Sequence, residues 1–385
     1  PIYLEPLAAI LSKKSRRPVK LIMTRTDVFE STGPAPGGKV KVKLGVDSSG
    51  KMLAASAVIK LEAGGFPEAF IEAAFKCVFS CYDIPSTRMD GYDVIVNKPS
   101  SAAYRAPGSP QVTFAMETLV DEICDKKGWD PLEFRIKNVA RKGTRTALGP
   151  LYTRIGLEEC LEAAKKSDHW NSKLDDNLTP GKKRGRGIAS GYWFNIGFKS
   201  HVNLALNTDG TVALTEGSTD IGGTRAAISM QAAEVLGIPA EDVRPTVVDT
   251  DSIGYTDVTG GSRTCYATGY AAYLASQKLI EEIEEKAALK WDIDVTEVVY
   301  ENGIIKSKSD SELKMTLKEF AADSPGGPVT ANASVDLEEA GGGFGVHIAD
   351  IEIDENTGKT DVVRYTAIQD CGKAIHPSYV EGQLQ

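Results

Sequence analysis

Two glycine-rich turns with the same pattern constrain the fold of this chain more than any other feature. The stretches "DIGGTRAAISMQAAEVLG" (220–237) and "VTGGSRTCYATGYAAYLASQKL" (258–279) each place two glycines, a hydroxyl residue and an arginine before an apolar run with helical spacing. Glycine permits positive φ angles and a close approach of the backbone to a ligand. We therefore expect the two turns to converge in space on a shared ligand.

The residues beside these glycines are of the types that bind phosphate. Free N–H groups and the positive end of a helix favour an anion. We expect Thr224 and Ser262 to cap their helices, and Arg225 and Arg263 to bond a phosphate. The alternative is a pair of ordinary helix starts without a ligand. The chain contains neither GxxxxGK[ST] nor a GxGxxG after a strand, and we interpret "GGGFG" (341–345) as a flexible turn because a strand pattern follows it.

A third turn, "AYRAPGSPQ" (103–111), leads into the helical run 110–127. One interpretation is an ordinary loop, in which Ser109 caps the helix and a proline occupies its first position. The other is a turn that presents Tyr104 and Arg105 to a ligand. The residues of this turn alone leave both interpretations open.

Strand and helix patterns mix along the chain without a regular βαβ rhythm, which predicts an α+β fold with two domains. Residues 1–140 form the first domain, the polar segment 141–184 is a linker or boundary region, and 185–385 form the second domain. The predicted helices are 1–15, 110–127, 130–140, 225–236 and 264–290. The predicted strands lie at 18–25, in a hairpin over 39–65, at 92–97, on both sides of the Asp-Gly turn 209–210, at 242–251 and in a hairpin over 347–370.

Composition excludes several classes of protein. The net charge is −9 without a basic stripe, which argues against a nucleic-acid partner. No run of 18 apolar residues predicts a membrane-spanning helix, and no signal peptide is recognisable, so we expect a cytoplasmic protein without a membrane partner. The six cysteines and four histidines are scattered, without the spacing of a zinc or iron–sulfur site. We expect free thiols and no direct metal ligand in this chain.

The motifs "YRAPGSPQ", "TDIGGTR", "TGGSRTCYATG" and "DCGKAIHPSYVEGQ" occur in the order found in one family. The chain resembles the molybdenum-binding subunit of the xanthine dehydrogenase/aldehyde oxidase family over nearly its whole length. The stretch "LEPLAAILSKKSRRPVKL" also resembles the family segment that follows its first glycine-rich molybdenum loop. The resemblance implies two molybdopterin-binding-type domains of mixed sheets with flanking helices.

The resemblance also implies roles for individual positions. The residues that it places at the cofactor are Tyr104, Arg105, Ala106, Gly108, Ile221, Gly222, Gly223, Thr224, Arg225, Thr259, Gly260, Gly261, Ser262, Arg263 and Gln383. The residues that it places in the substrate pocket are Ala35, Pro107, Tyr192 and Trp193.

Several positions depart from the family pattern. Gly223 replaces a glutamine of the second cofactor loop, and Ala35 replaces the arginine that recognises purines, which argues against xanthine as substrate. Ala106 replaces the copper-binding cysteine of carbon monoxide dehydrogenases. The resemblance further implies that the chain is truncated at both ends: it begins after the first glycine-rich loop and ends before the catalytic glutamate. We expect the general base to lie outside this chain, and the isolated chain to be inactive.

The function implied is that of a molybdenum hydroxylase. It would oxidise an aldehyde, a heteroaromatic compound or an aromatic acyl-CoA thioester with water as the oxygen source. The implied cofactor is molybdopterin with molybdenum, in its simple or cytosine dinucleotide form, with [2Fe-2S] clusters and FAD on partner chains or domains in a dimer of heteromers. Two alternatives remain: a phosphate- or nucleotide-binding transferase without molybdenum, and a cofactor-free scaffold fragment.

Overall fold

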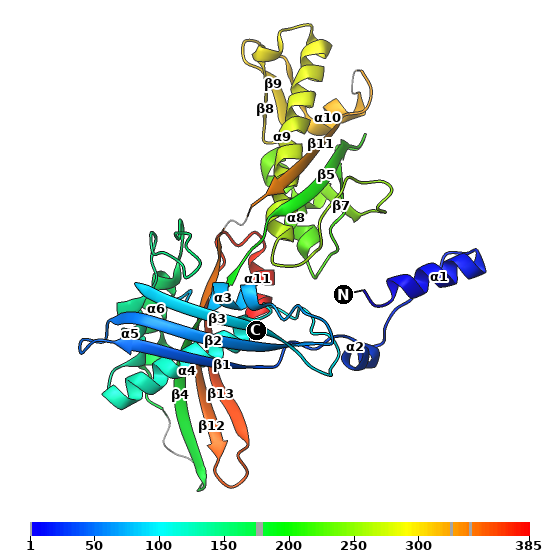
Figure 1. Ribbon diagram of the computed structural model, residues 1–385. Helices are drawn as coiled ribbons and strands as arrows, with labels where there is room; N and C mark the ends of the chain where they lie inside the picture. The colour runs from blue at the N-terminus through cyan, green and yellow to red at the C-terminus, as the bar shows by residue number, and fades with distance from the viewer. Residues whose placement is uncertain (1, 175–179, 324–325, 339–340) are drawn as a thin grey trace. The chain divides into compact units, whose positions relative to one another are not determined.

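The computed structural model describes residues 2–174, 180–323, 326–338 and 341–385. The chain forms two compact units, and both are built from separate stretches of sequence (Figure 1). Unit 1 comprises Pro1–Trp193 and Gly341–Cys371, and unit 2 comprises Phe194–Ala340 and Gly372–Gln385. The mixture of helices and sheets confirms the predicted α+β class.

The first sheet of unit 1 has the strand order β1-β2-β3. Its elements and the helices that accompany them are β1 (Gly38–Val46), β2 (Met52–Gly64), β3 (Ser86–Ile95), α3 (Ile71–Val78), α4 (Ser109–Lys127) and α5 (Pro131–Asn138). The hairpin of β1 and β2 is antiparallel, as the alternating sequence predicts, whereas β3 runs parallel to β2. Figure 1 shows α4 lying along this sheet.

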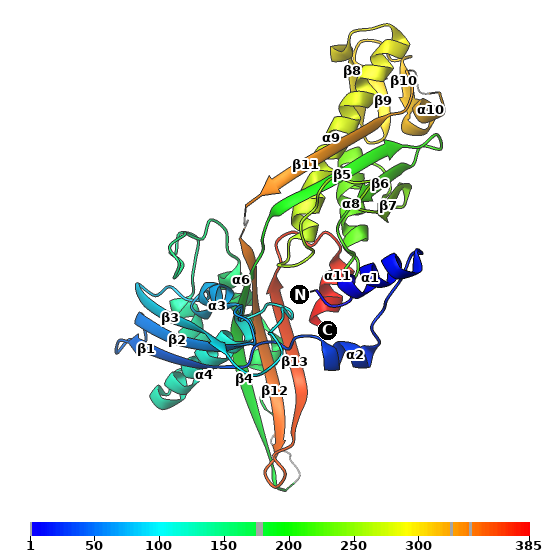
Figure 2. The same cartoon turned by 45° about the vertical axis from the view of Figure 1, so that its right-hand side comes forward.

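The second sheet of unit 1 has the order β13-β12-β4 and combines distant parts of the sequence (Figure 2). Its elements are β4 (Lys182–Phe194), β12 (Gly342–Asp354), β13 (Thr360–Asp370), α6 (Leu157–Lys166) and α7 (Asp168–Asn171). The buried carboxylate of Glu117 on α4 accepts hydrogen bonds from Arg135 Nε at 2.9 Å and from the backbone N–H of Ser190 on β4 at 2.7 Å. The ion pair joins α4 to α5, and the bond from Ser190 attaches α4 to the second sheet.

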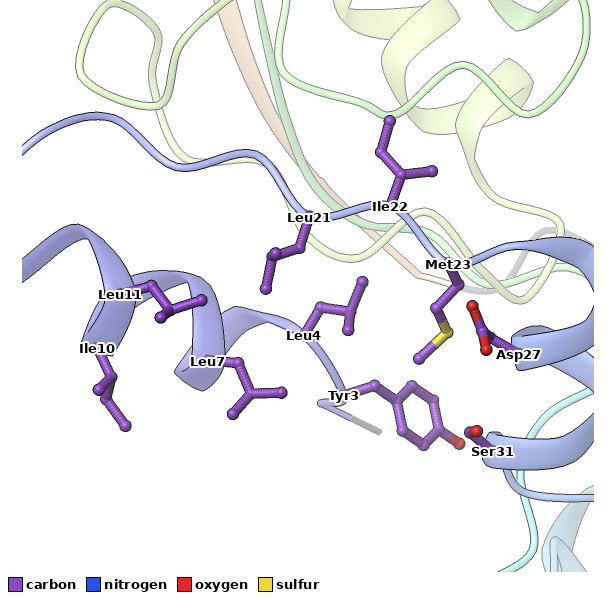
Figure 3. Close-up of a pocket in the computed structure, with 10 residues that line it drawn as sticks. All are labelled: Tyr3, Leu4, Leu7, Ile10, Leu11, Leu21, Ile22, Met23, Asp27 and Ser31. Atoms are coloured by element: carbon purple, nitrogen blue, oxygen red, sulfur yellow. The ribbon is translucent and has the colours of Figure 1, made fainter. Parts of the chain in front are cut away.

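Residues 2–31 form an arm with helices α1 (Glu5–Ser15) and α2 (Arg25–Ser31), neither of which contains a buried residue. Apolar side chains of α1 and of residues 21–23 line an open groove of about 640 Å³ (Figure 3). The predicted strand over 18–25 is wrong. Thr24 and Asp27 form a reciprocal capping box that begins α2 in this segment.

Unit 2 is built on a sheet of order β11-β5-β6-β7. Its main elements are β5 (Phe198–Leu206), β6 (Val212–Glu216), β7 (Val243–Val247), β11 (Thr330–Leu337), α8 (Thr224–Leu236) and α9 (Thr264–Trp291). Helices α8 and α9 pack together on this sheet, and alanines of α9 such as Ala271 and Ala275 are fully buried in the contact (Figure 2). Small side chains on α9 allow its backbone to come close to the strands.

Unit 2 also contains several shorter elements. They are the 3-10 turns η1 (Ala240–Asp242) and η2 (Val295–Glu297), the strands β8 (Val298–Glu301), β9 (Ile304–Ser307) and β10 (Lys314–Thr316), and the helices α10 (Leu317–Ala322) and α11 (Pro377–Leu384). Strands β8 to β10 form an antiparallel sheet of their own.

The structure differs from the expected linker over 141–184. Helix α6 lies in this segment and buries Leu157, Cys160, Leu161 and Ala164, whose i, i+3, i+4, i+7 spacing is that of a packed helix. Residues 175–179 of the segment lie outside the described residues. Long-range strand pairing also makes the units differ from the contiguous division into 1–140, 141–184 and 185–385, since β4 pairs with β12.

The "GGGFG" segment is not a flexible turn in the structure. Residues 342–345 belong to β12, and Phe344 is buried against Tyr152 and Tyr192. All six cysteines are free thiols. Over the described ranges, no helix has the length and apolar character needed to cross a membrane.

Candidate functional site

In unit 1, the turn before α4 has an unusual backbone conformation. The φ angles of Arg105, Ala106 and Gly108 are 29°, 58° and 88°. Residues with a Cβ atom rarely adopt positive φ, and such strain persists only where the surrounding structure imposes it. It is frequent at ligand-binding sites. Gly108, rather than the predicted Ser109, is the N-cap of α4.

Contacts on both sides of the turn impose this conformation. A Cβ atom at Gly108 would lie 3.0 Å from the carbonyl oxygen of Phe70 and 3.0 Å from the backbone nitrogen of Ala74, so the start of α4 packs directly on the start of α3. The hydroxyl of Ser109 donates a hydrogen bond to the carbonyl oxygen of Tyr192 at 2.9 Å. The turn is therefore held rigidly while Tyr104 and Arg105 stay exposed.

The structure brings Ala35 to this turn. The backbone N–H of Ala102 donates to the carbonyl oxygen of Pro34 at 2.8 Å, and Gln111 Nε2 donates to that of Pro36 at 2.9 Å. Ala35 lies between these two anchors and is exposed. Pro107, in the same turn, is half-buried. The fold thus brings Ala35 next to this turn, although the two are far apart in the sequence.

The two residues predicted to face a substrate, Tyr192 and Trp193, lie on opposite faces of β4. Tyr192 is only 8% exposed and packs against Phe344, with a distance of 4.7 Å between ring centroids, so it is a core residue. Side chains alternate between the two faces of a strand, and Trp193 is half-buried on the other face of β4. The prediction that Tyr192 faces a substrate is wrong for that reason.

In unit 2, the two glycine turns lie together, as predicted. The backbone N–H of Thr219 donates to Thr259 Oγ1 at 3.0 Å, across 40 residues of sequence. Behind the turns, Gln231 Nε2 of α8 donates to the carbonyl oxygen of Cys265 on α9 at 3.1 Å. The two helix starts therefore form one surface of unit 2.

The first turn is filled by its own carboxylate. Asp220 Oδ1 accepts hydrogen bonds from the backbone N–H groups of Gly222, Gly223 and Thr224 at 3.0–3.2 Å, and Oδ2 accepts from Arg225 Nε at 2.8 Å. These bonds, the one from Arg225 foremost, lower the pKa of Asp220 to about 2. Thr224 is the first residue of α8 and not its cap. The expected phosphate at this helix start is thus replaced by Asp220, and Arg225 is paired with it.

Arg263 supports the second turn from inside. It is 0% exposed, and it donates to the carbonyl oxygens of Gly197 at 2.7 Å, Lys199 at 2.6 Å and Asp257 at 3.1 Å. Burial lowers the pKa of its guanidinium. Arg263 is itself the N-cap residue of α9, and Ser262, with a φ of 61°, does not cap the helix. The prediction of a direct Arg263–phosphate contact is therefore wrong, because the buried guanidinium already donates its hydrogen bonds to backbone carbonyl groups.

The outer backbone of both turns is open. A Cβ atom at Gly222 or Gly260 would meet no heavy atom of the described residues within 4 Å. Helix α9, unlike α8, receives no cap from any side chain in the described part of the chain. Its first N–H groups, next to the buried charge of Arg263, suit a polar or anionic group. This donor set fits the polar edge and phosphate of a molybdopterin.

The C-terminal helix α11 covers the first turn. A Cβ atom at Gly223, where φ is 99°, would overlap the ring of Tyr379. Lys373 Nζ also pairs with Glu234 of α8 at 2.8 Å. Gln383 lies four residues after Tyr379, on the same face of α11. The structure therefore places Gln383 on the helix face that meets the turn, and it shows why position 223 admits no glutamine.

Sequence reasoning missed two residues of this region, Asp220 and Thr268. The Asp-x-Gly-Gly-Thr spacing was a usable signal for Asp220, since a short carboxylate before a helix start is a common cap. Thr268 lies inside α9, and no local sequence pattern indicates its contacts with Ser218 and Ser200.

Comparisons with known proteins agree with this geometry. Models of the molybdopterin cofactor-binding domain match residues 1–139 and residues 160–385. The xanthine dehydrogenase molybdenum-binding subunit of Escherichia coli O157:H7 is 29% identical over 99% of this chain and 53% of its own length. The aldehyde oxidoreductase molybdenum-binding subunit PaoC of Escherichia coli K12 is 29% identical over 98% of this chain and 51% of its own. The chain thus spans about half the length of the curated relatives it matches.

Solved structures share the fold. Quinoline 2-oxidoreductase from Pseudomonas putida 86 matches with a TM-score of 0.86 and 23% identity, over 98% of this chain and 53% of that one. Aldehyde oxidoreductase from Desulfovibrio gigas matches with a TM-score of 0.82 and 24% identity, over 100% of this chain and 42% of that one. The resemblance drawn from the four motifs is confirmed, and the chain belongs to the molybdopterin cofactor-binding domain family, with relatives among xanthine dehydrogenase and aldehyde oxidoreductase molybdenum-binding subunits.

Proposed function

We propose that this chain supplies cofactor-binding domains of a molybdenum hydroxylase that oxidises an aldehyde or a (hetero)aromatic substrate. Water is the oxygen source, and electrons pass to [2Fe-2S] clusters and FAD on partner chains or domains. The names of the relatives, which include aldehyde oxidoreductases and xanthine dehydrogenases, support the reaction class. When bound, the cofactor supplies the two-electron redox chemistry, and the protein supplies binding and orientation.

The observation that carries this proposal is the hydrogen bond from Thr219 to Thr259, which makes one surface of the two glycine turns. In the second turn, the backbone at Gly260 is open, and the buried Arg263 lies behind the turn. In the first turn, Ile221 and Gly222 are exposed while Asp220 fixes the backbone. Gln383 on α11 is the proposed phosphate contact. A nucleotide-binding transferase would need a phosphate at the start of α8, where the carboxylate of Asp220 already lies.

The turn of unit 1 has the complementary role of meeting the substrate. The exposed side chains of Tyr104 and Arg105, beside the strained backbone at Arg105 and Ala106, are the proposed contacts. Ala35 beside the turn lacks the charge that recognises a purine, so aldehydes, N-heteroaromatics and aromatic acyl-CoA thioesters are better candidates than xanthine. We assign no residue of this chain as the general base.

We assign the two cofactor-binding domains to the stretches that the family models match, residues 1–139 and 160–385. The proposal also includes iron–sulfur and FAD subunits or domains in a dimer of heteromers, a cytoplasmic location and either form of the pterin. This proposal includes neither nucleic acid nor a membrane as a partner.

Metal analysis of the full-length protein that contains this chain tests the proposal. We expect stoichiometric molybdenum, a fluorescent pterin after oxidation, and reduction of an artificial electron acceptor by an aromatic aldehyde but not by xanthine. Thr259→Val removes the acceptor that joins the turns, and it should lower the molybdenum content, whereas Thr259→Ser should retain it. Full-length protein without molybdenum would refute the proposal. The isolated 385-residue chain should contain none.

A further inference from the structure

A row of buried hydroxyl groups lies beneath the two glycine turns of unit 2. Thr268 Oγ1 of α9 is 2.7 Å from Ser218 Oγ and 2.9 Å from Ser200 Oγ. Ser218 follows β6, and Ser200 belongs to β5. All three residues are at most 1% exposed. Thr268 thus joins a helix to two separate strand segments through one oxygen atom.

Charged groups end this row on both sides. Arg263 Nη2 donates to Ser200 Oγ at 2.6 Å. At the other end, Glu216 Oε2 accepts from the backbone N–H of Ser218 at 2.5 Å. Glu216 is fully buried, and its Oε1 atom has no hydrogen-bond partner among the described residues. Burial raises the pKa of Glu216 despite this bond.

The direction of the hydrogen bonds follows from the donors available. A guanidinium only donates, so the oxygen of Ser200 accepts from Arg263 and its own hydrogen is left for Thr268. The hydroxyl of Thr268 then donates to the hydroxyl of Ser218. The hydroxyls of Ser200 and Thr268 each accept once and donate once, from the buried cation toward Ser218, whose backbone N–H bonds the buried carboxyl. Such a head-to-tail row is polarised, and its bonds strengthen one another.

The two ends of the row are continuous with the two turns. Ser218 precedes Thr219, whose N–H bonds Thr259 in the second turn. Arg263 follows Ser262 and holds the carbonyl oxygen of Asp257 at the other side of that turn. The row therefore connects the two turns beneath their backbones.

We propose that Thr268 is a positioning residue for the cofactor, whose hydroxyl sets the spacing of the two glycine turns. This inference rests on the proposed function, because it assigns the turns to a cofactor. Thr268 has no direct contact with the cofactor in this scheme, and it acts through Ser218 and Ser200.

A second buried hydroxyl on the same helix provides a matched control. Ser276 is 0% exposed, eight residues further along α9, and its hydroxyl donates to the carbonyl oxygen of Ala272 at 2.8 Å, within the helix. Ser276→Ala removes a buried hydroxyl from α9 without touching the turns. Thr268→Val removes the bridging hydroxyl with little change in shape, and Thr268→Ser keeps it.

The experiment uses the full-length protein and measures molybdenum and pterin per polypeptide, the rate of molybdenum loss after dilution, and hydrogen exchange in residues 219–222 and 259–262. Thr268→Val, which lacks the hydroxyl between Ser218 and Ser200, should lose molybdenum about tenfold faster. A buried hydrogen bond contributes enough free energy for such a factor. Exchange in both turns should rise. Thr268→Ser and Ser276→Ala should hold molybdenum like the unaltered protein.

Two results would overturn the inference and one would overturn its basis. Equal molybdenum retention in Thr268→Val and the unaltered protein would show that the bridge does not position the cofactor. Equal loss in Ser276→Ala would show that general destabilisation of α9, measured by urea unfolding, explains the effect. An unaltered protein that contains no molybdenum would instead refute the proposed function, and the inference with it.

Discussion

Replacing Asp220 with asparagine tests whether a carboxylate, rather than a bound anion, stabilises the first glycine turn. Asparagine keeps an oxygen that accepts from the N–H groups of Gly222, Gly223 and Thr224, so the substitution removes mainly the charge and the ion pair with Arg225. Lowering a carboxyl pKa from 3.8 to about 2 in the folded state corresponds to about 2.5 kcal/mol of stability at neutral pH. The side chain of Asp220 is 23% exposed, so solvent screening reduces this figure only moderately.

The sign of the pH dependence follows from the depressed pKa. The stabilisation is fully present above the unfolded value of 3.8 and is lost as the pH falls through about 2. Urea unfolding at several pH values should therefore show D220N less stable by about 2 kcal/mol at pH 7, and by roughly half as much at pH 3. Asp251→Asn, at an exposed position, is the control. A stability difference that does not change with pH, or no difference at all, would refute the assignment of this carboxylate to the N–H groups of α8.

Three further substitutions test other parts of the structure. Arg105→Ala in the full-length protein should lower turnover and leave the free energy of unfolding within about 0.5 kcal/mol, because the side chain is exposed; unchanged kinetics with all substrates would contradict its role. Burial raises the pKa of Glu216, so its protonated form favours folding, and the free energy of unfolding declines as the pH rises above 4.5. Glu216→Gln should lack this decline in urea unfolding. Parallel pH profiles for the variant and the unaltered protein would contradict the prediction. Gly223→Ala should cost more than Gly222→Ala in the same assay, because both have a φ of 99° but only Gly223 meets Tyr379.

Local signals in the sequence predicted the elements whose structure is decided within a few residues. The hairpin turn at Asp209–Gly210 and the Asp130 cap of α5 are formed by side chains that bond the backbone two or three residues away. The convergence of the glycine turns was also predictable, since both begin long helices that bury an apolar face. Helix α6 was missed although its four buried residues have clear helical spacing, because the polar residues around it outweighed that pattern.

The errors at the site have one physical origin. Whether an arginine faces a ligand or the protein depends on which carbonyl groups the fold brings to it, and for Arg263 those come from residues 197–199, about 64–66 positions earlier. The same holds for Tyr192, whose burial is decided by the packing of Phe344 from the far end of the chain. Residue types alone do not contain this information.

The strand order of the second sheet in unit 1 has a consequence for synthesis. The chain leaves this unit after Trp193 and returns at Gly341, so unit 2 is inserted between β4 and its partner β12. A ribosome makes β4 well before β12 exists, at about 5–20 residues per second, and the hydrogen-bonding edge of β4 lacks its native partner during that time. Contacts of such large sequence separation form slowly. The growing polypeptide therefore passes through a stage in which the main sheet of unit 2 is complete while unit 1 still lacks β12 and β13. At this stage the unpaired edge of β4 is the strand that a chaperone would protect.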